Sequence, residues 1–181
     1  MEDLKDIVYS IASGFENRNL RKLRKINDHL LGKVLVEFSK VSYELAVISY
    51  VLSKIVSKPR FLENEKGLNE IENSIKNLGR WIGKNNHEQI EAALKILYKS
   101  IHELEKEDPR FIIDLVSKGK LKAAATMYAQ GISLGVAAEM TGIEKQEILD
   151  YAGKTMMFDR VRDEMTIKDR LKTARKLIGR E

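Results

Sequence analysis

The sequence contains no cysteine among its 181 residues. Without thiols the chain cannot form disulfides, thiolate zinc sites or cysteine nucleophiles, and this fits the reducing cytoplasm, where we expect the protein to work. Histidine is almost as scarce, and none of His29, His87 and His102 has a second histidine at metal-ligand spacing. No Glu-x-x-His pair of the kind used by di-iron bundles occurs either. We therefore expect no metal and no cofactor.

Motifs of catalysis and of membrane insertion are also missing. The sequence has no nucleophile-elbow serine and no glycine-rich nucleotide fingerprint, and Gly153-Lys-Thr has Ile148 where a phosphate-binding loop requires glycine. We therefore do not expect an enzyme. The most apolar run, residues 43–57, is too short to span a bilayer and is interrupted by Glu44 and Lys54. It predicts a buried core helix and no membrane association.

Only two prolines occur, and strand-like alternation of apolar and polar residues is absent. Apolar residues recur instead at helical spacing, which predicts an all-α fold with helices near 4–15, 20–38, 42–57, 68–82 and 90–104. The third helix should stop before Pro59. The charged stretch around Asp108 and Pro109 can cap and open a new helix. We predict an antiparallel helical bundle at 1–107 and a smaller helical unit at 108–181.

The stretch GISLGVAAEMTGIEKQEILDYAG, residues 131–153, meets the demands of a helix-turn-helix. Two short helices that cross steeply need small residues at the contact, a glycine that accepts positive φ in the turn, and apolar residues on the inner face. Ser133 can cap the first helix, and Glu144 lies where a helix N-terminus favours negative charge. The residues expected at the turn and in the packing are Ala137, Ala138, Gly142, Ile143, Ile148 and Tyr151. An ordinary αα-hairpin is the alternative interpretation.

Residues of about 118–155 also resemble small antitoxin-like helix-turn-helix proteins of archaea and bacteria. The matching positions are Gly131, Ser133, Leu134, Gly135, Ala137, Ala138, Glu139, Gly142, Ile143 and Tyr151. The resemblance implies DNA binding by a dimer, in transcription control or toxin neutralisation. The whole chain is similar to uncharacterised archaeal helical proteins that end in such a motif, and this similarity carries no function.

The charge pattern departs from that of a typical DNA reader. The net charge of +5 allows a nucleic-acid partner without requiring one, and residues 132–153 carry four acids and one lysine. Ser133, Lys145 and Gln146 are the candidate DNA contacts within the motif, because lysine pairs with guanine and glutamine with adenine. The candidate phosphate contacts beside it are Lys154, Lys172, Arg175 and Lys176. A solvated helix face is the alternative interpretation of these flanking charges.

The same features support a second hypothesis, in which a degenerate helix-turn-helix binds a protein through its acidic helix and the adjacent Met156, Met157 and Phe158. The leading hypothesis is a DNA-binding regulatory protein that binds double-stranded DNA as a homodimer. A further basic cluster is formed by Arg18, Arg21, Lys22, Arg24 and Lys25. It could contact nucleic acid, but a solvated helix face is the favoured interpretation.

Overall fold

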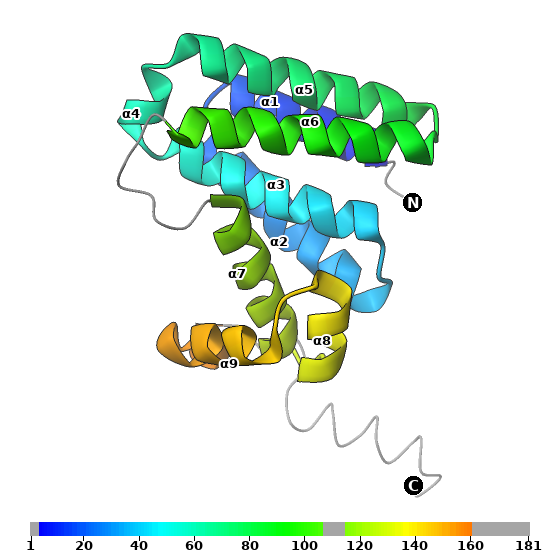
Figure 1. The fold of residues 1–181 in the computed structure, drawn as a ribbon, viewed down its shortest axis with the longest axis vertical. Coiled ribbons are helices and arrows are strands. Elements are labelled where there is room, and N and C mark those ends of the chain that lie inside the picture. The colour runs from blue at the N-terminus through cyan, green and yellow to red at the C-terminus, as the bar shows by residue number, and fades with distance from the viewer. Residues whose placement is uncertain (1–3, 107–114, 161–181) are drawn as a thin grey trace, which may run out of the picture. The chain divides into compact units, whose positions relative to one another are not determined.

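The computed structural model describes residues 4–106 and 115–160, and every regular element in these ranges is a helix (Figure 1). The predicted all-α fold class is confirmed. The helices are α1 Leu4–Glu16, α2 Leu20–Val36, α3 Lys40–Val56, α4 Pro59–Leu62, α5 Glu65–Gly83, α6 His87–Lys106, α7 Leu115–Ala129, α8 Leu134–Thr141, α9 Lys145–Lys154 and α10 Met157–Arg160.

The chain divides into two compact units, Met1–Ala123 and Ala124–Glu181. The division falls within α7, later than the boundary that the sequence predicts after residue 107. Gly119 in the first half of α7 gives the physical reason, because a Cβ there would lie only 3.1 Å from Val51 and 3.2 Å from Val47 of α3. This close approach ties the first half of α7 to the first unit. The predicted boundary itself, with Asp108 and Pro109, lies outside the described residues.

The first unit is built from helices that share one apolar core. α2 packs on α3, α5 packs on α6, and α1 lies against α2, α3 and α5. The helices begin where the sequence supplies caps: the side chains of Asn19, Ser39 and Asn64 accept hydrogen bonds from backbone N–H groups of the first turns of α2, α3 and α5. The largest fully buried side chains include Ile11, Phe15, Leu23, Leu30, Leu45, Ile48, Leu52, Ile55, Leu68, Ile71, Ile75 and Leu78.

Helix α3 is buried on nearly all sides, as its apolar run predicts. Two of its buried serines bond within the helix: the Ser49 hydroxyl donates to the carbonyl of Leu45 at 2.8 Å and the Ser53 hydroxyl donates to that of Tyr50 at 2.7 Å. Glu44 accepts a hydrogen bond from the hydroxyl of Tyr98 on α6. Burial, and then the charge of Glu44, raise the pKa of Tyr98, so this hydroxyl remains a donor at neutral pH. No helix in the described residues is long and apolar enough to cross a membrane.

Two features of the helices differ from those expected: the additional helix α4 and the earlier end of α2. The third helix ends at Val56, before Pro59 as predicted, but Pro59 then opens the short helix α4, which the sequence pattern does not indicate. Phe38 was expected on the apolar stripe of the second helix. It lies beyond the end of α2, is 38% exposed, and places its ring 6.4 Å from that of Tyr43.

The contact at Gly119 gives a stability prediction. Gly119→Leu should lower the free energy of unfolding by about 1–3 kcal/mol, because the new side chain must displace Val47 and Val51. Gly32→Leu is the matched control: Gly32 lies inside α2 with nothing within 4 Å of its Cβ position, so leucine there should be neutral or stabilise by up to about 0.8 kcal/mol. Chemical denaturation measures both. Equal effects would show that α7 does not pack on α3 in this way.

Candidate nucleic-acid interface on α8 and α9

Helix α8 begins at a side-chain cap. The Ser133 hydroxyl accepts a hydrogen bond from the backbone N–H of Val136 at 3.2 Å, which satisfies a donor that the helix cannot satisfy itself. The predicted capping role of Ser133 is therefore confirmed. Gly131, two residues earlier, has a φ of +103°, so the chain turns sharply between α7 and α8. A glycine accepts this conformation without strain.

The turn between α8 and α9 is set by Gly142. Its φ is +70°, and its N–H donates to the carbonyl of Ala138 at 2.8 Å, as in a left-handed helix cap. Nothing lies within 4 Å of a Cβ placed at Gly142, so the requirement for glycine is conformational rather than steric. The predicted turn is confirmed at this residue. Glu144 is then the N-cap of α9, although its side chain makes no capping hydrogen bond.

Helices α8 and α9 pack on one another through small and apolar side chains. Ala137 on α8 and Ile148 on α9 are fully buried, so the expected small contact and inner face are both present. Ala138, Ile143 and Tyr151, which were expected on the same face, are only partly buried. Ala137 on α8 and Ile148 and Ala152 on α9 are thus the buried residues of the two helices.

The second half of α7 and the short helix α10 complete the described part of the second unit. The rings of Tyr128 and Phe158 meet edge to face with centroids 5.2 Å apart. The Thr126 hydroxyl lies 3.9 Å from the sulfur of Met157, which is buried. The expectation that Met157 forms part of an exposed docking surface is therefore wrong. Its neighbours Met156 and Phe158 are exposed, as that hypothesis requires.

The side chains proposed to read bases lie at the exposed start of α9. Lys145 and Gln146 are both exposed in its first turn, and Lys154 is exposed at its end. Gln146 is already engaged, since its Nε2 donates to Oδ1 of Asp150 at 2.8 Å. This pair was not predicted from the sequence, although a glutamine four residues before an aspartate on a helix is a known signal for it. A base contact by Gln146 must compete with Asp150.

The described surface around α9 is acidic. Glu139, Glu144, Glu147 and Asp150 are exposed, and Lys145 and Lys154 are the exposed basic residues from 131 to 155. Lysines before the motif pack elsewhere: the Lys122 ammonium lies 4.4 Å from the ring centroid of Tyr50. Lys172, Arg175 and Lys176 lie outside the described residues, so their predicted role as phosphate contacts stays a prediction.

Among the described residues, no group of three or more His, Cys, Asp or Glu side chains could hold a metal ion. No family model, curated protein sequence or solved structure matches the chain. The functional argument therefore depends on the geometry and charge of the site.

The turn gives a second stability prediction. Gly142→Val should lower the free energy of unfolding by about 1–2 kcal/mol or more, because a β-branched residue is strained at positive φ. Gly153→Val is the control: Gly153 lies inside α9 at ordinary helical angles with open space around it, so the change should stay within about 0.5 kcal/mol. Denaturation curves of both variants provide the test. An unaffected Gly142→Val protein would show that this turn is not left-handed.

Proposed function

We propose that the protein is a DNA-binding regulatory protein, antitoxin-like or transcriptional, in which a helical bundle precedes a helix-turn-helix formed by α8 and α9. The observation that carries the proposal is the left-handed turn at Gly142, which ends α8 and allows α9 to begin three residues later. A buried Ala137 at the helix contact accompanies this turn. Both features are among those that a DNA-binding helix-turn-helix requires, and they support the proposal.

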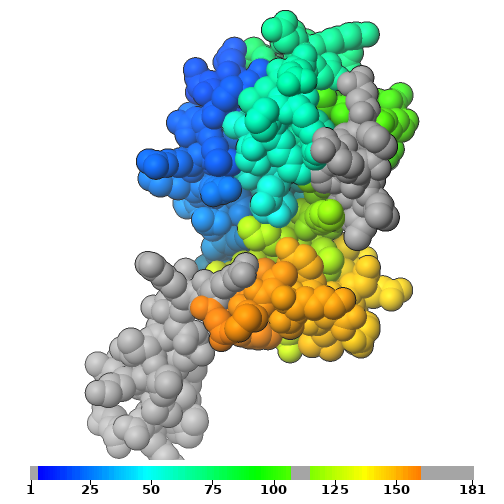
Figure 2. Space-filling view, turned by 90° about the vertical axis from the view of Figure 1, so that its left-hand side faces the viewer, coloured from blue at the N-terminus to red at the C-terminus, as the bar shows by residue number. Residues whose placement is uncertain are grey.

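The exposure of α9 supports a role in reading bases. In such motifs the first residues of the second helix contact base edges in the major groove. Lys145 and Gln146 occupy that position in α9 and are exposed. Figure 2 shows α9, in orange, at the surface of the molecule. We assign recognition of the DNA sequence to these two side chains, and a phosphate contact to Ser133.

Affinity must come from outside the base-reading first turn of α9, because phosphate neutralisation supplies most non-specific binding and the described surface around α9 is acidic. The sequence from 161 to 181 contains seven basic and four acidic residues. We assign phosphate contacts to Lys172, Arg175 and Lys176 of this segment and to Lys154 at the end of α9. Reading and holding the DNA are thus separate tasks, assigned to different parts of the chain.

The division of tasks predicts two different failures. The Lys145→Ala/Gln146→Ala variant should lose preference among duplex sequences and keep non-specific affinity, because only base contacts carry sequence information. Replacing Lys172, Arg175 and Lys176 by Ala should weaken binding to every duplex and reduce the salt dependence by about 0.9 log unit per lost phosphate contact. Fluorescence anisotropy across a salt series measures both effects.

A matched control removes the same charge from the other unit. The variant Lys66→Ala/Lys95→Ala/Lys99→Ala replaces three exposed lysines of α5 and α6 and should leave the salt dependence nearly unchanged. A wild-type protein without salt-dependent binding to duplex DNA at low ionic strength would refute the proposal. An equal loss of DNA affinity in the control and in the variant that lacks Lys172, Arg175 and Lys176 would refute the assignment of the phosphate contacts.

We also propose that the protein is a homodimer. A single helix-turn-helix with so little positive charge binds weakly, and two-fold symmetry doubles its contacts with a palindromic site. Multi-angle light scattering at micromolar concentration should give twice the chain mass of 20.7 kDa. A single species at the monomer mass would contradict this.

A specific observation favours protein binding as the second candidate function. Leu149, Met156 and Phe158 are large exposed apolar residues in the same short segment as the exposed acids Glu147 and Asp150. A partner with an apolar and basic surface would match this composition. If the DNA experiments fail, the wild-type protein should capture a protein partner. The Glu144→Lys/Glu147→Lys/Asp150→Lys variant should not capture it. Neither candidate function is catalytic.

A further inference from the structure

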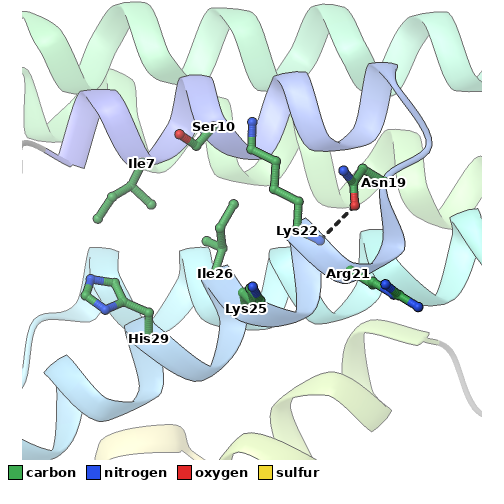
Figure 3. Close-up of a pocket in the computed structure, with 8 residues that line it drawn as sticks. All are labelled: Ile7, Ser10, Asn19, Arg21, Lys22, Lys25, Ile26 and His29. Atoms are coloured by element: carbon green, nitrogen blue, oxygen red, sulfur yellow. Dashed lines mark hydrogen bonds between the residues drawn. The ribbon is translucent and has the colours of Figure 1, made fainter.

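A groove in the first unit, outside the helix-turn-helix, runs between α1 and α2 (Figure 3). Its volume is about 490 Å³, which is in the usual range of pockets for small ligands, about 300–1,000 Å³. Near one end the two helices come close at Gly14, where a Cβ would lie 3.2 Å from Leu23. The groove, which we call the α1–α2 groove, is lined by Ile7, Ser10, Asn19, Arg21, Lys22, Lys25, Ile26 and His29.

The lining is basic. Arg21, Lys22, Lys25 and His29 all come from α2, and none of the eight lining residues is acidic. Ser10 of α1 and Asn19 at the start of α2 add short polar side chains. The Asn19 Oδ1 accepts from the backbone N–H of Lys22 at 2.9 Å, so its amide Nδ2 remains a donor for a ligand. Such a set of donors suits a bound anion.

The Lys22 ammonium donates to the Ser13 hydroxyl of α1 at 3.2 Å, but the stability of α2 does not explain why Arg21 and Lys25 are cationic. The first turn of α2 contains no acidic residue, and Arg21 and Lys22 lie where the partial positive charge of a helix N-terminus disfavours cations. Arg21 and Lys25 also form a like-charge pair four residues apart, which is unfavourable on a helix. Cations at a helix N-terminus and like charges four residues apart are both unfavourable, and their occurrence at one place indicates a functional site. A bound anion would relieve both repulsions.

The groove also has an apolar part. Figure 3 shows Ile7 of α1 and Ile26 of α2 directed towards one another across the gap, with Lys22 extending from α2 towards α1. Ile7 is buried and Ile26 is partly buried, so they form a floor beneath the charged side chains. A simple inorganic anion would leave this floor uncovered. A ligand with an apolar or aromatic portion would cover it.

We propose that the α1–α2 groove binds a small phosphorylated molecule with an apolar or aromatic portion, such as a nucleoside monophosphate. The phosphate lies among Arg21, Lys22 and Lys25, and the apolar portion covers Ile7 and Ile26. This site is independent of DNA reading by α9, and the two can fail separately. It assigns a function to Arg21, Lys22 and Lys25 of the basic cluster, for which the sequence alone favours a solvated face.

Isothermal titration calorimetry at low ionic strength tests the site with AMP, adenosine and inorganic phosphate. AMP should bind the wild-type protein more tightly than either fragment, because only AMP contacts both the cations and the floor. In Arg21→Gln/Lys25→Gln the dissociation constant for AMP should rise at least about tenfold, as expected for two lost charge-assisted hydrogen bonds. The ligand-free variant should be at least as thermostable as the wild type, because a like-charge repulsion is removed.

The matched control is Arg24→Gln/Lys99→Gln. It removes the same charge from two exposed positions, one of them on α2, that do not line the groove. AMP affinity should fall less than in the groove variant, because Arg24 and Lys99 do not line the groove and act only through the overall field of the protein. An equal loss in both double variants, or no AMP binding to the wild type, would overturn the proposal. Phosphate binding as tight as AMP binding would overturn the assigned ligand class. Lys25→Gln alone provides the same comparison if the double variant does not fold.

Discussion

The burial of α3 is the constraint on which the first unit depends. Twelve of its seventeen residues are buried, so apolar side chains must cover it from several directions. α1 and α2 supply part of this cover, and Gly119 allows α7 to approach it closely. One polar contact to α3 crosses between helices: the amide of Asn27 on α2 donates to the carbonyl of Ala46 at 2.9 Å. The buried hydroxyl of Tyr43 on α3 has no hydrogen-bond partner among the described residues. An unpaired polar group at such a position would cost about 1–3 kcal/mol.

The packing of α1 and α2 against α3 also positions the α1–α2 groove. Leu23 and Leu30 are buried in the core, which turns the opposite side of α2 outwards. Arg21 and Lys25 therefore project from a helix whose orientation is fixed by its apolar side. The donors are held by packing rather than by a mobile loop, and this lowers the entropy lost when a ligand binds. The packing of the core thus sets the orientation of the side chains that we propose to bind the ligand in the α1–α2 groove.

Much of the fold follows from the sequence, because apolar spacing and special backbone angles are local properties. The stripes predict the five long helices of the first unit, and Gly142 is predicted at positive φ because few other residues accept it. Features that depend on distant contacts could not be predicted in this way. Three features depend on contacts between residues of separate elements: the approach of Gly119 to α3, the burial of Met157 and the hydrogen bond between Tyr98 and Glu44. The groove depends on how far α1 and α2 separate, which neither helix encodes alone.

The acids on α9 acquire a physical role if this helix reads bases. Non-specific binding depends almost entirely on phosphates, so Glu147 and Asp150 weaken it wherever the protein lies on DNA. At the correct sequence the base contacts of Lys145 and Gln146 add to the binding free energy that the phosphate contacts supply at every sequence. Gln146 must leave Asp150 to contact a base, whereas at a wrong base it can keep this 2.8 Å hydrogen bond. Repulsion lowers the affinity of the shared phosphate contacts at every site, so binding through phosphates alone becomes weak and only sequences that add the base contacts are well occupied.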